Sequence, residues 1–192
     1  MTEQELIKEL QNGSNKAFRD LIENHQGNVV NTCYGFLMNR EEAEDVAQEV
    51  FIEVYRSIGS FKQDSSLSTW LYRISTNKSI DLIRKRKRKK RIQNLVGFYD
   101  KDENQMIDLP SNSQDPEEIM EQKERLAILH QAIEQLPSNQ KIAFTLSKFE
   151  SLSGNEIAEI METSLSSVEA LLHRARKNLR ELLHNYYYKS DV

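Results

Sequence analysis

Eight consecutive cations at residues 84–91 constrain this chain more than any other feature, because such a run cannot be buried in a protein core. The charges repel one another, so they either stay in water or meet a polyanion. The run continues a segment with helical spacing and lies between two globular segments, which favours nucleic acid as the polyanion. A solvated charged segment and a nuclear localisation signal remain the alternatives for this pattern.

The overall charge of −4 hides this basic band. Residues 1–83 carry 8 basic and 13 acidic groups, and residues 92–123 carry 2 basic and 8 acidic groups. Acidic segments therefore flank the band on both sides in the sequence. The band supplies a footprint for phosphates, and the acidic segments suit a basic partner.

The 192 residues include only 6 glycines and 3 prolines, which favours long helices over a turn-rich β fold. Residues 1–92 have the spacing of packed helices, whereas residues 93–123 lose that periodicity and gather aspartate, serine and proline. Residues 124–192 return to helical spacing. The sequence therefore predicts an all-α fold with two small helical domains, 1–92 and 124–192, joined by a flexible acidic linker at 93–123.

Nothing in the sequence supports catalysis, a cofactor or a bound metal. The histidines His25, His130, His173 and His184 are far apart, and the glycines form no phosphate-binding loop. Cys33 has no partner for an internal disulfide, which suits a reducing cytoplasm. No apolar run reaches the roughly 20 residues needed to span a bilayer. We expect a soluble cytoplasmic protein that is not an enzyme and does not insert into membranes.

A helix predicted at residues 40–58 buries one apolar face and leaves a second face with mixed chemistry. This second face has an isoleucine among its polar residues, where water would not require one. An ordinary solvated surface and a partner-docking surface both fit this pattern. The face comprises Asp45, Gln48, Glu49, Ile52 and Arg56.

A loop at 59–65 precedes a second long helix, which begins near Ser66 and runs into the basic band. On this helix Asn77, Asp81 and Arg84 share one side, so they form a polar ladder that either ties helices together or faces a ligand.

The second domain has the spacing of a helix-turn-helix. Ser153 and Glu156 fit a capping box at the start of a helix of about two turns, and a tight turn at 162–165 precedes a longer helix. The outer face of that longer helix has small residues first and basic residues later, which suits entry into the DNA major groove. A plain helical hairpin with a solvated basic face is the alternative.

Several motifs occur in the order of a known family. Residues 42–51, residues 68–74, and Asn77 with Asp81 and Arg84 resemble region 2 of the extracytoplasmic-function group of bacterial sigma factors. Leu136-Pro137 with Gln140, residues 156–158 and residues 167–176 resemble region 4 of that group. The resemblance covers nearly the whole chain except the linker.

The resemblance implies a sigma factor that binds core RNA polymerase and promoter DNA, with an anti-sigma factor as a further partner. Docking on polymerase falls to Asp45, Gln48, Glu49 and Ile52. Recognition and opening of the −10 element falls to Phe61, Lys62, Asp64, Ser65, Trp70, Asn77, Arg84, Lys85 and Arg88. Recognition of the −35 element falls to Ser166, Ser167, Glu169, Ala170, His173, Arg174, Arg176 and Lys177.

The sequence departs from the family pattern at Glu169 and Leu171, where many members carry lysine or arginine. Two roles remain open for Glu169. It has capping-box spacing from Ser166, and its carboxylate is also able to accept a hydrogen bond from a cytosine amine.

Two rival functions make different predictions. A stand-alone helix-turn-helix regulator would bind specific DNA tightly without polymerase. An RNA-binding adaptor would bind RNA through residues 84–91 and make no contact with polymerase. The ordered motifs favour the sigma factor.

Overall fold

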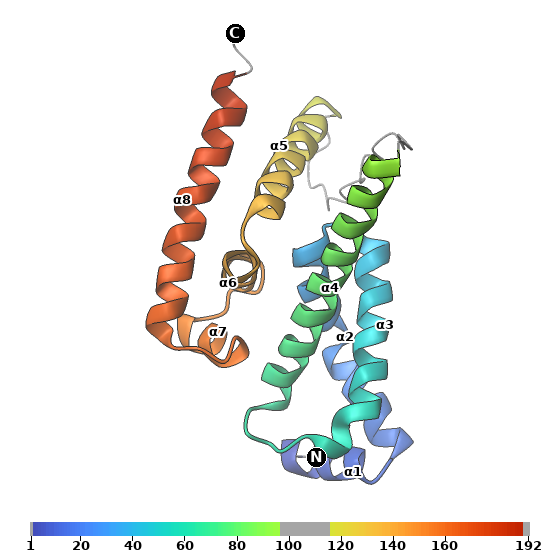
Figure 1. The fold of residues 1–192 in the computed structure, drawn as a ribbon. Coiled ribbons are helices and arrows are strands. Elements are labelled where there is room, and N and C mark those ends of the chain that lie inside the picture. Colours follow the sequence, from blue (N-terminus) through green and yellow to red (C-terminus); the bar gives the residue numbers. More distant parts are fainter. Residues whose placement is uncertain (1, 97–115, 190–192) are drawn as a thin grey trace. The chain divides into compact units, whose positions relative to one another are not determined.

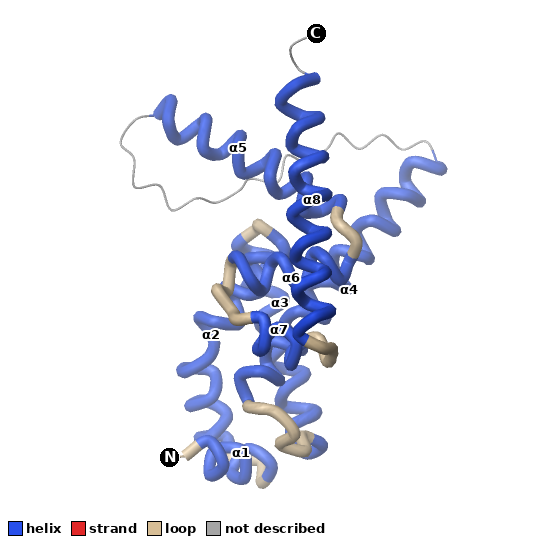
Figure 2. Tube along the Cα trace, turned by 90° about the vertical axis from the view of Figure 1, so that its left-hand side faces the viewer, coloured by secondary structure: helices blue, strands red, loops and turns tan. Residues whose placement is uncertain are grey.

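The computed structural model describes residues 2–96 and 116–189 of the chain, and its regular elements there are helices (Figure 1). No strand occurs in these residues (Figure 2), and the all-α prediction is confirmed. The chain forms two compact units, one built from the first four α-helices and the other mainly from the last four. The helices are α1 (Glu3–Gln11), α2 (Asn15–Leu37), α3 (Arg40–Ser57), the 3-10 turn η1 (Ile58–Ser60), α4 (Leu67–Val96), α5 (Pro116–Gln135), α6 (Ser138–Lys148), α7 (Gly154–Ile160) and α8 (Leu165–Lys189).

In the first unit, α2, α3 and α4 lie side by side and α1 packs at one end of them (Figure 1). The seam between the three helices is filled by aliphatic side chains that water does not reach, including Leu21, Leu37, Val50, Val54 and Leu67. Burying side chains of this size provides most of the driving force for packing helices together, at about 1.5–3 kcal/mol for each. The periodic apolar face predicted for residues 40–58 supplies the contribution of α3 to this core.

Short polar side chains begin the helices of this unit. The side chain of Ser14 accepts a hydrogen bond from the Ala17 N–H at the start of α2, and that of Asn39 accepts one from the Glu42 N–H at the start of α3. At the start of α4, Ser66 Oγ accepts a hydrogen bond from the Thr69 N–H at 3.1 Å. Each of these side chains accepts a hydrogen bond from a backbone N–H that the first turn of a helix otherwise leaves without an acceptor. These bonds favour a helix start at each of these residues.

In the second unit, α8 packs against α6 and against the C-terminal part of α5. The core of this unit contains Ala132, Ile133, Leu136, Ala175 and Leu179, with Phe144 and several leucines packed around them. A hydrogen bond of 2.8 Å from Asn178 Nδ2 to the buried amide oxygen of Gln140 adds a polar tie between α8 and α6. The apolar stripe predicted for the last helix therefore faces the interior of the unit.

The predicted linker, residues 93–123, is helical at both of its ends. Helix α4 continues to Val96, and α5 already begins at Pro116, where proline is well tolerated in a first turn. The intervening residues, 97–115, lie outside the described part of the chain. The predicted flexible acidic linker thus includes the last turn of α4 and the first turns of α5, and its middle lies outside the described residues.

Candidate protein and nucleic-acid interfaces

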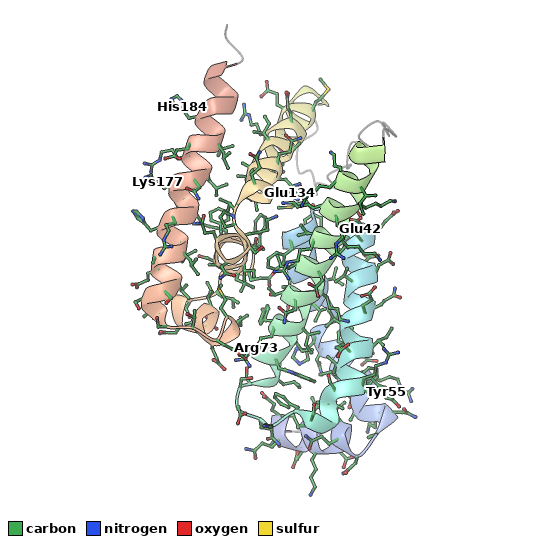
Figure 3. All side chains as sticks on the ribbon, in the orientation of Figure 1. Glu42, Tyr55, Arg73, Glu134, Lys177 and His184 are labelled. Atoms are coloured by element: carbon green, nitrogen blue, oxygen red, sulfur yellow. The ribbon has the colours of Figure 1, made fainter. Side chains whose placement is uncertain are left out.

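The predicted docking face on α3 is exposed along its whole length. Asp45, Gln48 and Glu49 are open to solvent, and Ile52 keeps 50 % of its surface exposed. Tyr55, one turn further on, is 57 % exposed and projects from the helix (Figure 3). An isoleucine and a tyrosine left in water beside two carboxylates suit a partner surface with both apolar and basic groups.

This face borders a groove between α2 and α3 with a volume of about 840 Å³. Gln48, Ile52 and Tyr55 contribute to the groove from α3, and Phe18 from α2 contacts Tyr55 edge to face with ring centroids 5.1 Å apart. The sequence prediction missed Phe18 and Tyr55. Their only signal in the sequence is an aromatic residue at helical spacing, which is more often a core residue.

The loop between η1 and α4 has an aromatic base and a polar tip. The Phe61 ring is only 9 % exposed, whereas Lys62, Gln63 and Asp64 are exposed and Ser65 is half-buried. The −10 role predicted for Phe61 stays a prediction, and the residue itself packs inward. The groups that the loop offers to a ligand belong to its polar tip.

Helix α1 fastens both ends of this loop. The Gln11 side-chain amide donates hydrogen bonds to the Ile58 carbonyl at 3.3 Å and to the Phe61 carbonyl at 3.1 Å. The Glu3 carboxylate accepts a 2.8 Å hydrogen bond from the Leu67 N–H and so caps α4 from another helix. Sequence reasoning missed both residues, because a lone Gln and a lone Glu on a first helix carry no distinguishing pattern.

The polar ladder of α4 is present on one exposed side of the helix. Asn77, Asp81 and Arg84 are all exposed, and Arg84 Nη1 lies 3.3 Å from Asp81 Oδ1. Lys85 and Arg88 follow on exposed turns. Trp70, at the start of the same helix, is half-buried. The structure therefore leaves the predicted −10 cations open to a phosphate backbone.

Arg86, within the basic run, is held against another helix. Arg86 forms an ion pair with Glu42 in the first turn of α3, and the two side chains keep only 25 % and 33 % of their surfaces exposed. Glu42 is labelled in Figure 3. A run that is uniform in sequence is thus not uniform in its surroundings.

The helix-turn-helix has the predicted capping box at the start of α7. The Glu156 carboxylate accepts hydrogen bonds from the Ser153 N–H at 2.8 Å and the Ser153 hydroxyl at 2.6 Å, and the Ser153 hydroxyl accepts one from the Glu156 N–H. These bonds stabilise the carboxylate and lower the pKa of Glu156, with side-chain bonding as the larger cause. The prediction of this box is confirmed.

The alternative capping role of Glu169 is wrong. Helix α8 begins at Leu165, and its cap is Ser164, whose hydroxyl accepts a hydrogen bond from the Ser167 N–H at 3.2 Å. Ser166 therefore lies inside the helix, one turn before Glu169, and Glu169 is an exposed surface residue. The position of the cap depends on where the chain leaves the left-handed turn at Glu162, with φ 51°. Sequence spacing alone allowed either Ser164 or Ser166 to cap the helix.

The outer face of α8 presents the predicted −35 residues. Ser167 and Ala170 near the helix start are half-buried, and the basic residues beyond them are open, with Lys177 on the side of α8 away from α6 (Figure 3). A small, closely approachable start followed by cations suits a helix entering the major groove. The exposed members are Ser166, Glu169, His173, Arg174, Arg176 and Lys177.

Two further observations apply only to residues 2–96 and 116–189. No group of three or more His, Cys, Asp or Glu side chains gathers there with the geometry of a metal site. No helix in that part of the chain is long and apolar enough to cross a membrane.

Comparisons with known proteins cover both units. The family model "Sigma-70 region 2" matches residues 21–89, and the model "Sigma-70, region 4" matches residues 126–179. The chain is 34 % identical to the RNA polymerase sigma-H factor of Pseudomonas aeruginosa, over 94 % of this chain and 93 % of that protein. It is also 34 % identical to the ECF RNA polymerase sigma factor SigW of Bacillus subtilis, over 92 % of this chain and 94 % of that protein.

Two solved structures have the same fold at lower identity. One is CnrH in complex with the cytosolic domain of CnrY, with a TM-score of 0.62, 20 % identity, and coverage of 94 % of this chain and 96 % of that one. The other is the sigma factor RpoE in complex with the anti-sigma factor NepR from Bartonella quintana. Its TM-score is 0.61 at 22 % identity, with coverage of 88 % of this chain and 97 % of that one.

Proposed function

This chain belongs to the extracytoplasmic-function group of the sigma-70 family. We propose that three separate surfaces of the chain bind polymerase, open the −10 element and recognise the −35 element. The chain is a promoter-directing sigma factor. Its family consists of DNA-binding transcription factors, and we propose that it has no catalytic activity of its own. The first domain, 1–92, docks on core polymerase and opens the −10 element. The acidic linker, 93–123, connects it to the second domain, 124–192, which recognises the −35 element.

Core RNA polymerase docks on α3 in this proposal. The observation that carries it is the exposure of Asp45, Gln48 and Glu49 together with Ile52 on one face of a helix whose other face is core. The carboxylates steer a basic partner and fix its orientation, while the isoleucine supplies apolar area to exclude water. Tyr55 extends this face toward the α2–α3 groove, so we include it among the docking residues.

The −10 element meets the loop and the exposed side of α4. The loop tip, Lys62 to Ser65, takes the extruded base, and Asn77, Arg84, Lys85 and Arg88 follow the strand and its phosphates. Unstacking a base costs a few kcal/mol, which contacts to the base and the backbone must offset. Phe61 and Trp70 support this surface from beneath, because both are partly or largely withdrawn from solvent.

The −35 element is read by the outer face of α8. Ser166, Ser167 and Ala170 allow the helix backbone to approach the base pairs, and His173, Arg174, Arg176 and Lys177 contact base edges or phosphates. The capping correction leaves Glu169 free for a base, so we propose that it accepts a hydrogen bond from a cytosine amine in the major groove.

We propose that the chain acts in the cytoplasm, where RNA polymerase works, and that an anti-sigma factor regulates it. The support for this regulation is membership of the family together with the fold shared with RpoE of Bartonella quintana, which was solved with the anti-sigma factor NepR. No stand-alone regulator is favoured by any of the comparisons above.

Run-off transcription with bacterial core polymerase, with and without this protein, on a genomic promoter library tests the proposal. We expect promoter-specific transcripts only when core polymerase and this protein are both present. The matched measurement is promoter binding by the protein without core polymerase, which we expect to be weak. Tight, specific binding without core and no added transcript would instead identify a stand-alone regulator.

A further inference from the structure

Within the basic run of α4, Arg86 is anchored to α3, and the proposed function does not use this residue. Arg86 pairs with Glu42 across the two helices, and both side chains are about two-thirds to three-quarters withdrawn from solvent. The −10 cations Lys85 and Arg88 on either side of Arg86 are exposed. Because the Arg86 side chain packs against α3, it is not available to the DNA that Lys85 and Arg88 are proposed to contact.

The place of this pair in the fold makes it a support for the end of α4. Helices α3 and α4 run antiparallel, and a second pair, Lys78 Nζ with Glu53 Oε2 at 3.3 Å, joins them further along the same seam. Glu42 lies in the first turn of α3, whereas α4 continues from Lys87 to Val96 (Figure 1). The stretch of α4 beyond the pair runs past the N-terminal end of α3 and carries the remaining cations of the run.

The Arg86–Glu42 ion pair offsets part of the electrostatic repulsion within the basic run. Lysines and arginines three and four positions apart repel one another and weaken an isolated helix. A carboxylate supplied from another helix offsets that repulsion for one cation and holds the helix against the core. Glu42 is also favoured where it stands, because a negative charge suits the N-terminal turn of α3.

We infer that Arg86 is a positioning residue: through Glu42 it fixes the direction of the C-terminal part of α4, so that the neighbouring cations meet the DNA backbone, and it makes no phosphate contact itself. The inference rests on the proposed role of α4 at the −10 element. It assigns different tasks to chemically alike neighbours in one run.

The test is a double-mutant cycle in the full chain, using Glu42→Gln, Arg86→Gln and both together. Hydrogen exchange of residues 84–92 in the free protein reports the anchoring, and permanganate reactivity of promoter thymines in the holoenzyme reports opening. We expect each single variant to speed exchange and to slow opening by about fivefold, the upper range for a partly solvated ion pair. The double variant should be no worse than either single variant.

The charge swap Glu42→Arg with Arg86→Glu should restore most of the lost protection and opening, because the pair is reconstituted in reverse. Glu41→Gln is the matched control, since Glu41 is exposed in the same first turn of α3 and loses the same charge. We expect it to change neither measurement.

The salt dependence of promoter binding separates positioning from phosphate contact. Arg88→Gln should lower the slope of log K against log salt by about 0.7–0.9, the value for one lost phosphate contact. Arg86→Gln should leave the slope unchanged. A slope lowered by Arg86→Gln as much as by Arg88→Gln, or effects of Glu42→Gln and Arg86→Gln that add, would overturn the inference. An unchanged slope in Arg88→Gln would instead count against the proposed DNA contact of α4.

Discussion

The ring of Phe61 stacks on the indole of Trp70, with ring centroids 4.7 Å apart and planes inclined by 25°. The contact joins the loop after η1 to the first turn of α4. It makes an aromatic pair the floor of the loop whose tip is proposed to capture a promoter base. A loop with a rigid floor has less conformational entropy to lose when it binds.

Replacing Phe61 with Ala should therefore destabilise the protein as well as impair opening. Loss of a buried phenylalanine costs about 3–5 kcal/mol of unfolding free energy. Lys62→Ala and Asp64→Ala, on the exposed tip, should change stability by no more than about 0.5 kcal/mol and still reduce permanganate reactivity of the −10 thymines. Urea denaturation beside the permanganate assay checks both. An unaltered urea midpoint in Phe61→Ala would show that the ring is not a structural floor.

Charge reversal on α3 should remove polymerase binding. Replacing Asp45 and Glu49 together with Lys places two cations where a basic partner is proposed to dock, and we expect at least a tenfold loss of co-purification with core enzyme. The control is Glu9→Lys with Glu23→Lys, which makes the same charge change at exposed sites on α1 and α2. Circular dichroism should show equal helicity in both proteins. Equal retention of core by the two would contradict the docking face.

Arg174→Ala should weaken promoter binding mainly at the upstream element. Loss of a guanine or phosphate contact costs about 1–3 kcal/mol of binding free energy. Arg180→Ala, an equal loss of charge at an exposed site further along α8, is the control. Holoenzyme affinity for promoters with an intact or scrambled −35 element measures the effect. An effect that disappears on the scrambled DNA indicates a guanine contact, and an equal effect on both DNAs indicates a phosphate contact. If Arg174→Ala abolished melting while binding stayed intact, the assigned roles of the two domains would be reversed.

The capping box of α7 should make that helix sensitive to acid. The folded pKa of Glu156 is lowered from its ordinary value of 4.5 by hydrogen bonds from Ser153. A lowered folded pKa means that the stabilisation is fully present above pH 4.5 and is lost as pH falls through the folded value. Hydrogen exchange protection of residues 154–160 should therefore decline below pH 4.5.

Ser153→Ala should reduce that protection at neutral pH and flatten its decline with acid, because the hydroxyl partner of Glu156 is gone. Glu159→Gln, which removes an exposed carboxyl from the same helix, should keep the decline. If protection of residues 154–160 declined equally steeply with acid in Ser153→Ala, the acid sensitivity would come from groups other than Glu156.

The sequence by itself determined the local architecture and the family. Helical spacing defined α3 to within a residue of its observed bounds, Arg40–Ser57, and the Ser153–Glu156 capping box placed the start of α7 correctly. These features depend on residues within four positions of one another, and such short-range patterns survive in any helical context. The ordered motifs then indicated a sigma factor across both halves of the chain.

Tertiary structure alone decided which residues of a motif face inward and which helices hold the functional loops. Phe61 packs on Trp70, Glu3 caps α4 from 64 residues away, and Glu42 takes one arginine out of a uniform basic run. None of these pairings has a periodic signal, because each depends on how whole helices pack, and packing brings together positions that the sequence keeps far apart.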